Sequence, residues 1–247
     1  MTKPCEAPDL LAMRERIIVA LDVDSAEKAR EMVAELDGHV GAFKIGMQLF
    51  NAEGPEFVRE LASAGHKIFL DLKYHDIPNT VAGAAVEAVR MGVWMFNVHA
   101  MGGSDMMRAT VKAVDEVCGR ENLAKPLIIG VTVLTSTGES ELNEIGIAEP
   151  ATSAVVRLAK LADSSGLHGV VASPNEAAAI RSSIDNKDFV IVTPGIRQAS
   201  ATKDDQRRVN SFRQALANGS SYAVIGRPIT GSADRVAAVS EICSEID

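Results

Sequence analysis

Short apolar runs recur along the whole chain, and each is followed by a segment with the signals of a helix. Several of these runs are apolar at every position, which is typical of strands buried on both faces of a parallel sheet. The pattern predicts eight strands, at residues 16–21, 40–45, 67–72, 93–98, 127–133, 169–172, 189–192 and 222–225.

The segments between the apolar runs carry signals for the ends of helices. Asp24 and Glu27 have the spacing of a capping pair, and Pro55 and Pro78 suit the first turn of a helix. Glycines follow several of the predicted ends. The predicted helices cover residues 26–36, 55–65, 78–91, 104–118, 151–164, a segment that begins at Pro174, 206–217 and 233–246.

Eight strand–helix repeats in a chain of 247 residues favour a (β/α)₈ TIM barrel of the α/β class. An open doubly wound sheet usually has fewer strands and a dedicated nucleotide-binding turn. Because no linker or low-complexity tract interrupts the alternation, residues 14–247 are predicted to form one barrel domain. Residues 1–13 are predicted to be a loose N-terminal extension.

Composition limits the classes of function. The chain is 47% apolar and 23% charged, contains no run of about 18 apolar residues, and lacks an apolar leader after Met1. We therefore expect a cytoplasmic protein that does not bind membranes. The net charge of −8 gives no electrostatic reason to expect a nucleic-acid partner, which calls for clustered Lys and Arg.

The cysteines and histidines form no recognisable reactive or metal-binding pattern. Cys5, Cys118 and Cys243 are widely spaced, which argues against a disulfide framework and a structural zinc site. His75 and His99 lie near the ends of predicted strands, but neither fits a nucleophile–base arrangement. We expect neither of them to act in catalysis.

Charged residues gather at the carboxyl ends of the first three predicted strands, which is where barrel enzymes place their active sites. These residues are Asp22, Lys44, Asp71 and Lys73. Asp71 and Lys73 are two apart, so in extended backbone their side chains project to the same face. We expect the four to converge in one cluster, whose burial is costly unless the charges are paired. Ordinary ion pairs at the barrel rim are the alternative.

A phosphate site is predicted at the other side of the barrel mouth. Gly226 and Arg227 follow the eighth strand, where barrels commonly bind phosphate, and an arginine can make a bidentate bond to it. The polar stretch 193–208 is long enough for a lid, with Arg197 and Gln206 as its contacts. A turn glycine beside a solvated arginine, and a surface loop without function, are the alternatives.

With these motifs, the chain resembles the orotidine 5′-phosphate decarboxylase family over essentially its whole length after the N-terminal extension. The most specific match is the run DLKYHDIPNT at residues 71–80. The other matching segments are residues 20–22, 43–46, 98–100, 134–136, 193–197 and 225–229.

The resemblance implies a chemistry and an assembly. It implies decarboxylation of orotidine 5′-phosphate to UMP and carbon dioxide in pyrimidine biosynthesis, without a cofactor or a metal. Lys73 would protonate C6 as carbon dioxide leaves, and Asp71 would lie near the substrate carboxylate. It also implies a homodimer, with Asp76 and Thr80 contributed across the interface.

The resemblance also assigns the binding residues. Lys44 and Asp22 would bind the ribose hydroxyls and support the charge network. Thr135 and Ser136 would face the pyrimidine. The phosphate would be held by the four residues already named as a phosphate site, Arg197, Gln206, Gly226 and Arg227.

Two other functions remain open at this point. Metal-dependent sugar-phosphate decarboxylases and synthases share the Asp-x-Lys-x-x-Asp pattern, but place a glutamate that binds magnesium where this chain has Lys44. A non-catalytic barrel that binds a phosphate ligand is the second alternative. Lys73 argues against it, because a binding protein needs no proton donor there.

Overall fold

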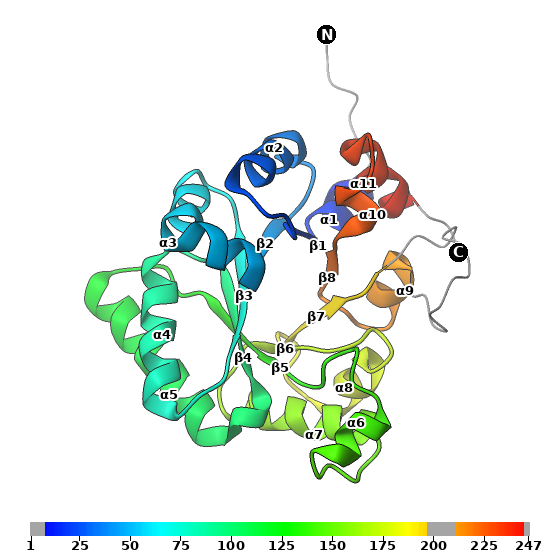
Figure 1. The fold of residues 1–247 in the computed structure, drawn as a ribbon. Helices are drawn as coiled ribbons and strands as arrows, with labels where there is room; N and C mark the ends of the chain where they lie inside the picture. Colours follow the sequence, from blue (N-terminus) through cyan, green and yellow to red (C-terminus); the bar gives the residue numbers. More distant parts are fainter. Residues whose placement is uncertain (1–7, 197–210, 245–247) are drawn as a thin grey trace.

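The computed structural model describes residues 8–196 and 211–244, which form a closed barrel of eight parallel strands with helices around it (Figure 1). The strands pair in chain order, and β8 closes the barrel against β1. The predicted (β/α)₈ fold is confirmed, and each predicted strand overlaps an observed one. The strands are β1 Ile17–Ala20, β2 Ala42–Gly46, β3 Ile68–Tyr74, β4 Met95–His99, β5 Leu127–Val131, β6 Gly169–Val171, β7 Val190–Pro194 and β8 Tyr222–Ile225.

The major helices lie outside the strands and match most of the predicted segments, two of them residue for residue. They are α2 Ala26–Leu36, α3 Met47–Ser63, α4 Pro78–Arg90, α5 Gly103–Glu121, α7 Ala151–Ser164, α8 Ala177–Ser183, α9 Phe212–Ala217 and α11 Arg235–Ser244. The short helices η1 Ala100–Gly102, α6 Glu139–Glu144 and α10 Arg227–Thr230 were not predicted. Helices of one or two turns carry too few residues to show an amphipathic period.

The N-terminal segment is more ordered than the sequence predicts. Residues Pro8–Arg14 form helix α1, which packs against α11. Met13 is buried, and Arg14 donates a hydrogen bond from Nη2 to Ser240 Oγ at 2.9 Å. The prediction of a loose extension is therefore wrong for residues 8–13, because burial of the helix against α11 stabilises it. Residues 1–7 lie outside the described part of the chain.

Two local helix signals also need correction. Helix α3 begins at Met47 rather than Pro55. Gly54 adopts φ 73° and interrupts the helix immediately before the proline, which lets the two helical segments follow each other. Pro55 thus opens only the second segment of α3. The N-cap of α2 is Ser25, whose Oγ accepts a hydrogen bond from the Lys28 N–H at 3.5 Å, instead of the predicted Asp24–Glu27 pair.

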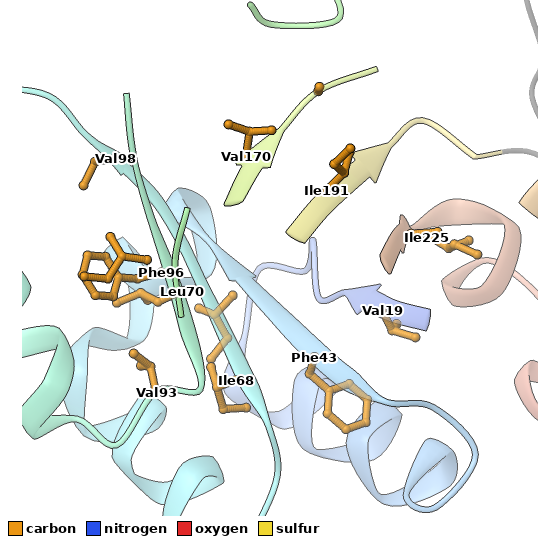
Figure 2. Packing of buried hydrophobic residues seen from close by; sticks show 14 of the residues in the cluster. Val19, Phe43, Ile68, Leu70, Val93, Phe96, Val98, Val170, Ile191 and Ile225 are labelled. Carbon is orange, nitrogen blue, oxygen red and sulfur yellow. The ribbon is translucent and has the colours of Figure 1, made fainter. Parts of the chain in front are cut away.

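Buried side chains form one cluster inside the barrel and a larger one between the strands and the surrounding helices. This division follows from the alternation of side chains along a strand. Figure 2 shows part of the outer cluster, including Val19, Phe43, Ile68, Phe96 and Ile191. The inner cluster consists of Ile18, Ala20, Ala42, Phe69, Met95, Ile129, Val192 and Val224. Within residues 8–196 and 211–244, no helix has the length and apolarity needed to cross a bilayer.

Candidate active site

The barrel interior ends in a layer that is polar on one side and apolar on the other. Because side chains alternate along a strand, the next inward position lies two residues beyond each member of the inner cluster. On β1 to β4 these positions hold polar residues, which are Asp22, Lys44, Asp71 and Asn97. On β5 and β7 the same step leads from Ile129 to Val131 and from Val192 to Pro194.

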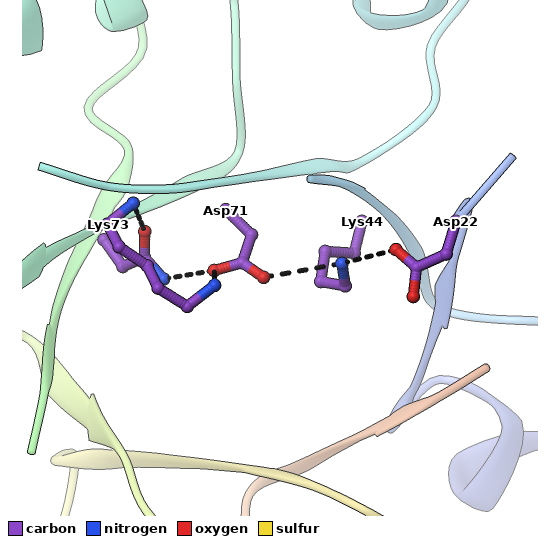
Figure 3. A network of polar contacts seen from close by, with 5 residues as sticks. Asp22, Lys44, Asp71 and Lys73 are labelled. Atoms are coloured by element: carbon purple, nitrogen blue, oxygen red, sulfur yellow. Dashed lines mark hydrogen bonds and ion pairs between the residues drawn. The ribbon is translucent and has the colours of Figure 1, made fainter. Parts of the chain in front are cut away.

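The four predicted charges do converge, as a chain of alternating sign (Figure 3). Lys73 Nζ donates to Asp71 Oδ1 at 2.7 Å. Lys44 Nζ lies 3.4 Å from Asp71 Oδ2 and donates to Asp22 Oδ1 at 3.0 Å. Each lysine thus faces at least one carboxylate, and Asp71 is shared by both lysines. The cluster is internally paired, as its burial requires.

Asp71 is the most enclosed anion of this charge chain, with 13% of its side chain exposed. Burial alone would raise the pKa of the Asp71 carboxyl. The ammonium groups of Lys44 and Lys73, with hydrogen bonds from Lys73 and Asn97, outweigh burial and hold that pKa below its usual range. Asp71 is therefore a carboxylate near neutral pH. Asp22, at the outer end of the chain, is 64% exposed.

Asn97 belongs to the same polar layer, although the sequence did not identify it as a site residue. It lies on β4, is fully buried, and donates from Nδ2 to Asp71 Oδ1 at 2.7 Å. Its side-chain oxygen accepts the backbone N–H of Lys73 at 2.8 Å. The sequence does indicate that the Asn97 side chain points into the barrel, because Asn97 lies two residues after Met95, a member of the inner cluster.

A pocket of about 220 Å³ opens beside this charge chain. Lys44, Asp71 and Lys73 line one side, and Thr135 and Ser136, from the segment after β5, also contribute. The rest of the lining is apolar and consists of Phe69, Val131, Val133, Leu134, Val171, Ala172, Pro194 and Val224. This lining suits a small, partly apolar ligand that carries a charged substituent.

Asp76 and Thr80 do not join the charge chain of their own subunit. Both lie near the start of α4, are exposed, and are not part of the pocket lining. Asp76 Oδ1 accepts only the neighbouring N–H of Ile77, at 2.6 Å, among the hydrogen bonds recorded for the described residues. In a single subunit these two predicted site residues are thus displayed on the surface.

Of the four residues predicted to bind phosphate, Gly226 and Arg227 lie within the described part of the chain. Gly226 lies beside the end of β1, where an added Cβ atom would come within 3.7 Å of Ala20 Cβ and 4.0 Å of Asp22 Oδ2. Arg227 follows it, is exposed, and begins α10. Arg197 and Gln206 lie outside the described residues.

The two histidines near the site contact each other. The rings of His75 and His99 lie 5.4 Å apart, and burial, together with the charges of His75 and Lys73, lowers the pKa of His99. Neither histidine lines the pocket. Across residues 8–196 and 211–244, no three His, Cys, Asp or Glu side chains are grouped closely enough to hold a metal ion.

Comparison with known sequences decides the family. The sequence model of the orotidine 5′-phosphate decarboxylase / HUMPS family matches residues 15–242. The chain belongs to this family. The predicted family and enzyme class are thereby confirmed, and the Asp71–Lys73 pair lies in the region that the family shares.

Relatives within the family match over nearly their full length. The chain is 49% identical to an orotidine 5′-phosphate decarboxylase of Syntrophotalea carbinolica, covering 96% of this chain and 97% of that protein. It is also 49% identical to one of Syntrophus aciditrophicus, covering 94% and 93%. Among solved structures, an orotidine 5′-phosphate decarboxylase of Lactobacillus acidophilus superposes with a TM-score of 0.79 at 37% identity, over 92% of this chain and 96% of that one.

Proposed function

We propose that the protein decarboxylates orotidine 5′-phosphate to UMP and carbon dioxide, with Lys73 as the proton donor to C6. The observation that carries the proposal is the alternating charge chain, with Lys44 and Asp71 largely enclosed, that borders the pocket of a barrel in this family. Near-full-length identity of 49% to decarboxylases of this specificity supports the same substrate.

The chemistry requires a fixed cation beside C6. Loss of carbon dioxide leaves an electron pair in the plane of the pyrimidine ring, where no π system accepts it. An ammonium group held next to C6 stabilises this carbanion electrostatically and then donates a proton to it. Lys73 suits this role, because its Nζ is held by Asp71 Oδ1 at 2.7 Å and lines the pocket.

Asp71 has two roles in this proposal. Its carboxylate fixes Lys73, and it also faces the position of the substrate carboxylate, which it repels until carbon dioxide leaves. Both roles require Asp71 to be ionised, and the neighbouring Lys44 and Lys73 keep it so. Lys44 holds the charge chain together between Asp71 and Asp22.

The other proposed contacts follow the partly polar, partly apolar lining of the pocket. Thr135 and Ser136, which line the pocket beside its apolar wall, are proposed to bind polar groups of the pyrimidine. Asp22, exposed at the rim and bonded to Lys44, is placed to bind ribose hydroxyls. Gly226 and Arg227, with Arg197 and Gln206, are proposed to hold the phosphate. Binding energy from the phosphate, far from C6, can then be used to order the site.

We also propose a homodimer in which Asp76 and Thr80 complete the site of the neighbouring subunit. The segment from His75 to Thr80 is exposed in one subunit, and Ile77 within it is 66% exposed. Met47 and Met101 are further large apolar side chains on the surface, at 53% and 36% exposure. Exposed apolar residues beside the active site are typical of an interface that buries them. The cytoplasmic location stays a prediction.

Two measurements test the proposal. The ultraviolet absorbance of orotidine 5′-phosphate, followed with purified protein and no added cofactor, should decrease as UMP forms. A constant absorbance would overturn the proposed activity.

The second measurement addresses the metal-dependent alternative. The Lys44 ammonium lies between two carboxylates, at the position that a metal ligand would need, and it would repel a divalent cation. Decarboxylation should therefore continue in EDTA. Activity that stopped in EDTA and returned with magnesium would refute a metal-free mechanism.

A further inference from the structure

The strand that carries Asp71 and Lys73 is irregular at these two residues. Strands β3 and β4 pair Leu70 with Phe96 and Tyr74 with Val98, so residues 71–73 of β3 lie opposite the single residue Asn97 of β4. This arrangement is a β-bulge, which interrupts the ladder of backbone hydrogen bonds and redirects side chains. Within the bulge, Lys73 adopts φ 54°, which is unfavourable for a residue with a Cβ atom.

The Asn97 side chain makes hydrogen bonds to both Asp71 and Lys73 at this interruption. Its side-chain oxygen accepts the Lys73 N–H at 2.8 Å, and its Nδ2 donates to Asp71 Oδ1 at 2.7 Å. Both ends of one fully buried amide are therefore used, one on each member of the Asp71–Lys73 pair. Aspartate at this position offers only acceptors when ionised, and alanine offers neither group.

We propose that Asn97 is a positioning residue for the decarboxylation, because it holds the bulge that aims Lys73 and orients the carboxylate of Asp71. This inference rests on the proposed function. It adds Asn97 to the residues proposed for the reaction, as one that contacts neither C6 nor the leaving group. Without Asn97, the Lys73 backbone relaxes toward negative φ and its ammonium moves away from C6. A displacement of about 1 Å at a reacting group can cost about 100-fold in rate.

The test compares Asn97→Ala and Asn97→Asp with the control variant Thr110→Val. Thr110 is also fully buried, and its hydroxyl donates to the Met106 carbonyl within α5, at 2.8 Å, outside the charge chain. The Asn97→Asp side chain keeps the size of asparagine and an acceptor for the Lys73 N–H, but it replaces the donor to Asp71 with a second carboxyl group. For each protein, kcat for orotidine 5′-phosphate, the dissociation constant for UMP and the unfolding midpoint are measured.

Both Asn97 variants are expected to lose about 100-fold in kcat. UMP affinity should change less than about 3-fold, because Asn97 does not line the pocket. Thr110→Val should lower the unfolding midpoint without a comparable loss of kcat.

A pH profile separates positioning from a purely structural role. In Asn97→Ala, removal of the donor raises the pKa of Asp71 toward its ordinary value, and in Asn97→Asp the added carboxyl group raises it further by repulsion. The acid limb of kcat should therefore move to higher pH in both variants, and further in Asn97→Asp. Apart from the carboxyl group that Asn97→Asp introduces, the charged or titratable groups near Asp71 are unchanged in these variants. They are Asp22 on β1, Lys44 on β2, Lys73 on β3, His99 on β4, and His75 beside His99.

The outcomes are distinguishable. If the wild-type protein is active and kcat of Asn97→Ala lies within about 3-fold of the wild-type value, the inference is overturned and the proposed function stays intact. An unmoved acid limb, or loss of folding in both Asn97 variants, would also overturn it, since Asn97 would then hold the barrel rather than the site. Failure of the wild-type protein to decarboxylate orotidine 5′-phosphate would instead overturn the proposed function.

Discussion

Replacing Lys44 with methionine tests whether the charge chain stabilises the barrel as a coupled unit. Only 11% of the Lys44 side chain is exposed, and methionine preserves most of its apolar stem. At an effective dielectric constant of about 20, opposite charges 3.4 Å apart, as Lys44 Nζ and Asp71 Oδ2 are, attract by roughly 5 kcal/mol.

Much of this attraction is offset. The methionine variant does not bear the cost of desolvating the Lys44 ammonium, and Asp71 keeps its bonds to Lys73 and Asn97. We therefore expect Lys44→Met to lower the free energy of unfolding by about 2 to 3 kcal/mol at pH 7. A double-mutant cycle with Asp71→Asn should give a coupling energy of about 2 kcal/mol.

The pH dependence of this loss has a definite sign. The pKa of Asp71 is lowered in the folded state, so its stabilisation is fully present above its unfolded value of 3.8 and is lost as pH falls through the folded pKa. The difference between wild type and Lys44→Met should therefore be largest near neutral pH and should shrink below about pH 4.

Urea unfolding followed by circular dichroism, at one fixed protein concentration, measures both effects. Lys28→Met is the matched control, because Lys28 pairs with Asp24 at a shorter distance, 2.8 Å, with both side chains exposed at the start of α2. That pair should contribute far less. A coupling energy near zero for Lys44 and Asp71, or a loss of stability that does not change between pH 3 and pH 7, would refute the reasoning.

Three further predictions concern catalysis. Lys73→Ala should abolish turnover while UMP binding stays measurable by calorimetry, because the pocket walls remain. Mixing Lys73→Ala with Asp76→Ala subunits should restore about a quarter of wild-type activity, because half of the random dimers contain one intact site. Ser136→Ala should lower kcat/KM for orotidine 5′-phosphate by about 10-fold, the usual cost of one lost buried hydrogen bond.

Each of these predictions has a contrary result. Turnover by Lys73→Ala would remove the proposed proton donor. Mixed subunits that stay inactive, although native mass spectrometry shows heterodimers, would place Asp76 outside the neighbour's site. An unchanged kcat/KM in Ser136→Ala, with Thr137→Val as the neighbouring control, would show that Ser136 does not face the substrate.

The regular parts of the molecule could be predicted because they depend on local patterns. Continuous apolar runs mark strands that are buried on both faces, and eight of them with intervening helices leave the closed barrel as the simplest arrangement. The positions of Asp22, Lys44 and Asp71 follow from the same period, since each lies two residues beyond an inward-facing core residue.

The irregular parts depend on partners that are distant in sequence. Helix α1 is ordered by contact with α11, and α3 begins before Pro55 because Gly54 accommodates the break. Helix α1 is too short to be predicted from its own residues. In α3, Pro55 is a stronger local signal for a helix start than any residue near Met47.

The sequence by itself determined the barrel, the ends of the strands at which the charges gather, and the family to which the chain belongs. Only the tertiary structure decided how Asp71 and Lys73 meet. A regular strand would bring them to one face through its two-residue period, whereas here a bulge opposite Asn97 and a left-handed Lys73 bring the ammonium to the carboxylate. The physical reason is that the bulge is stabilised from a neighbouring strand, by an amide that lies 24 residues away in the chain.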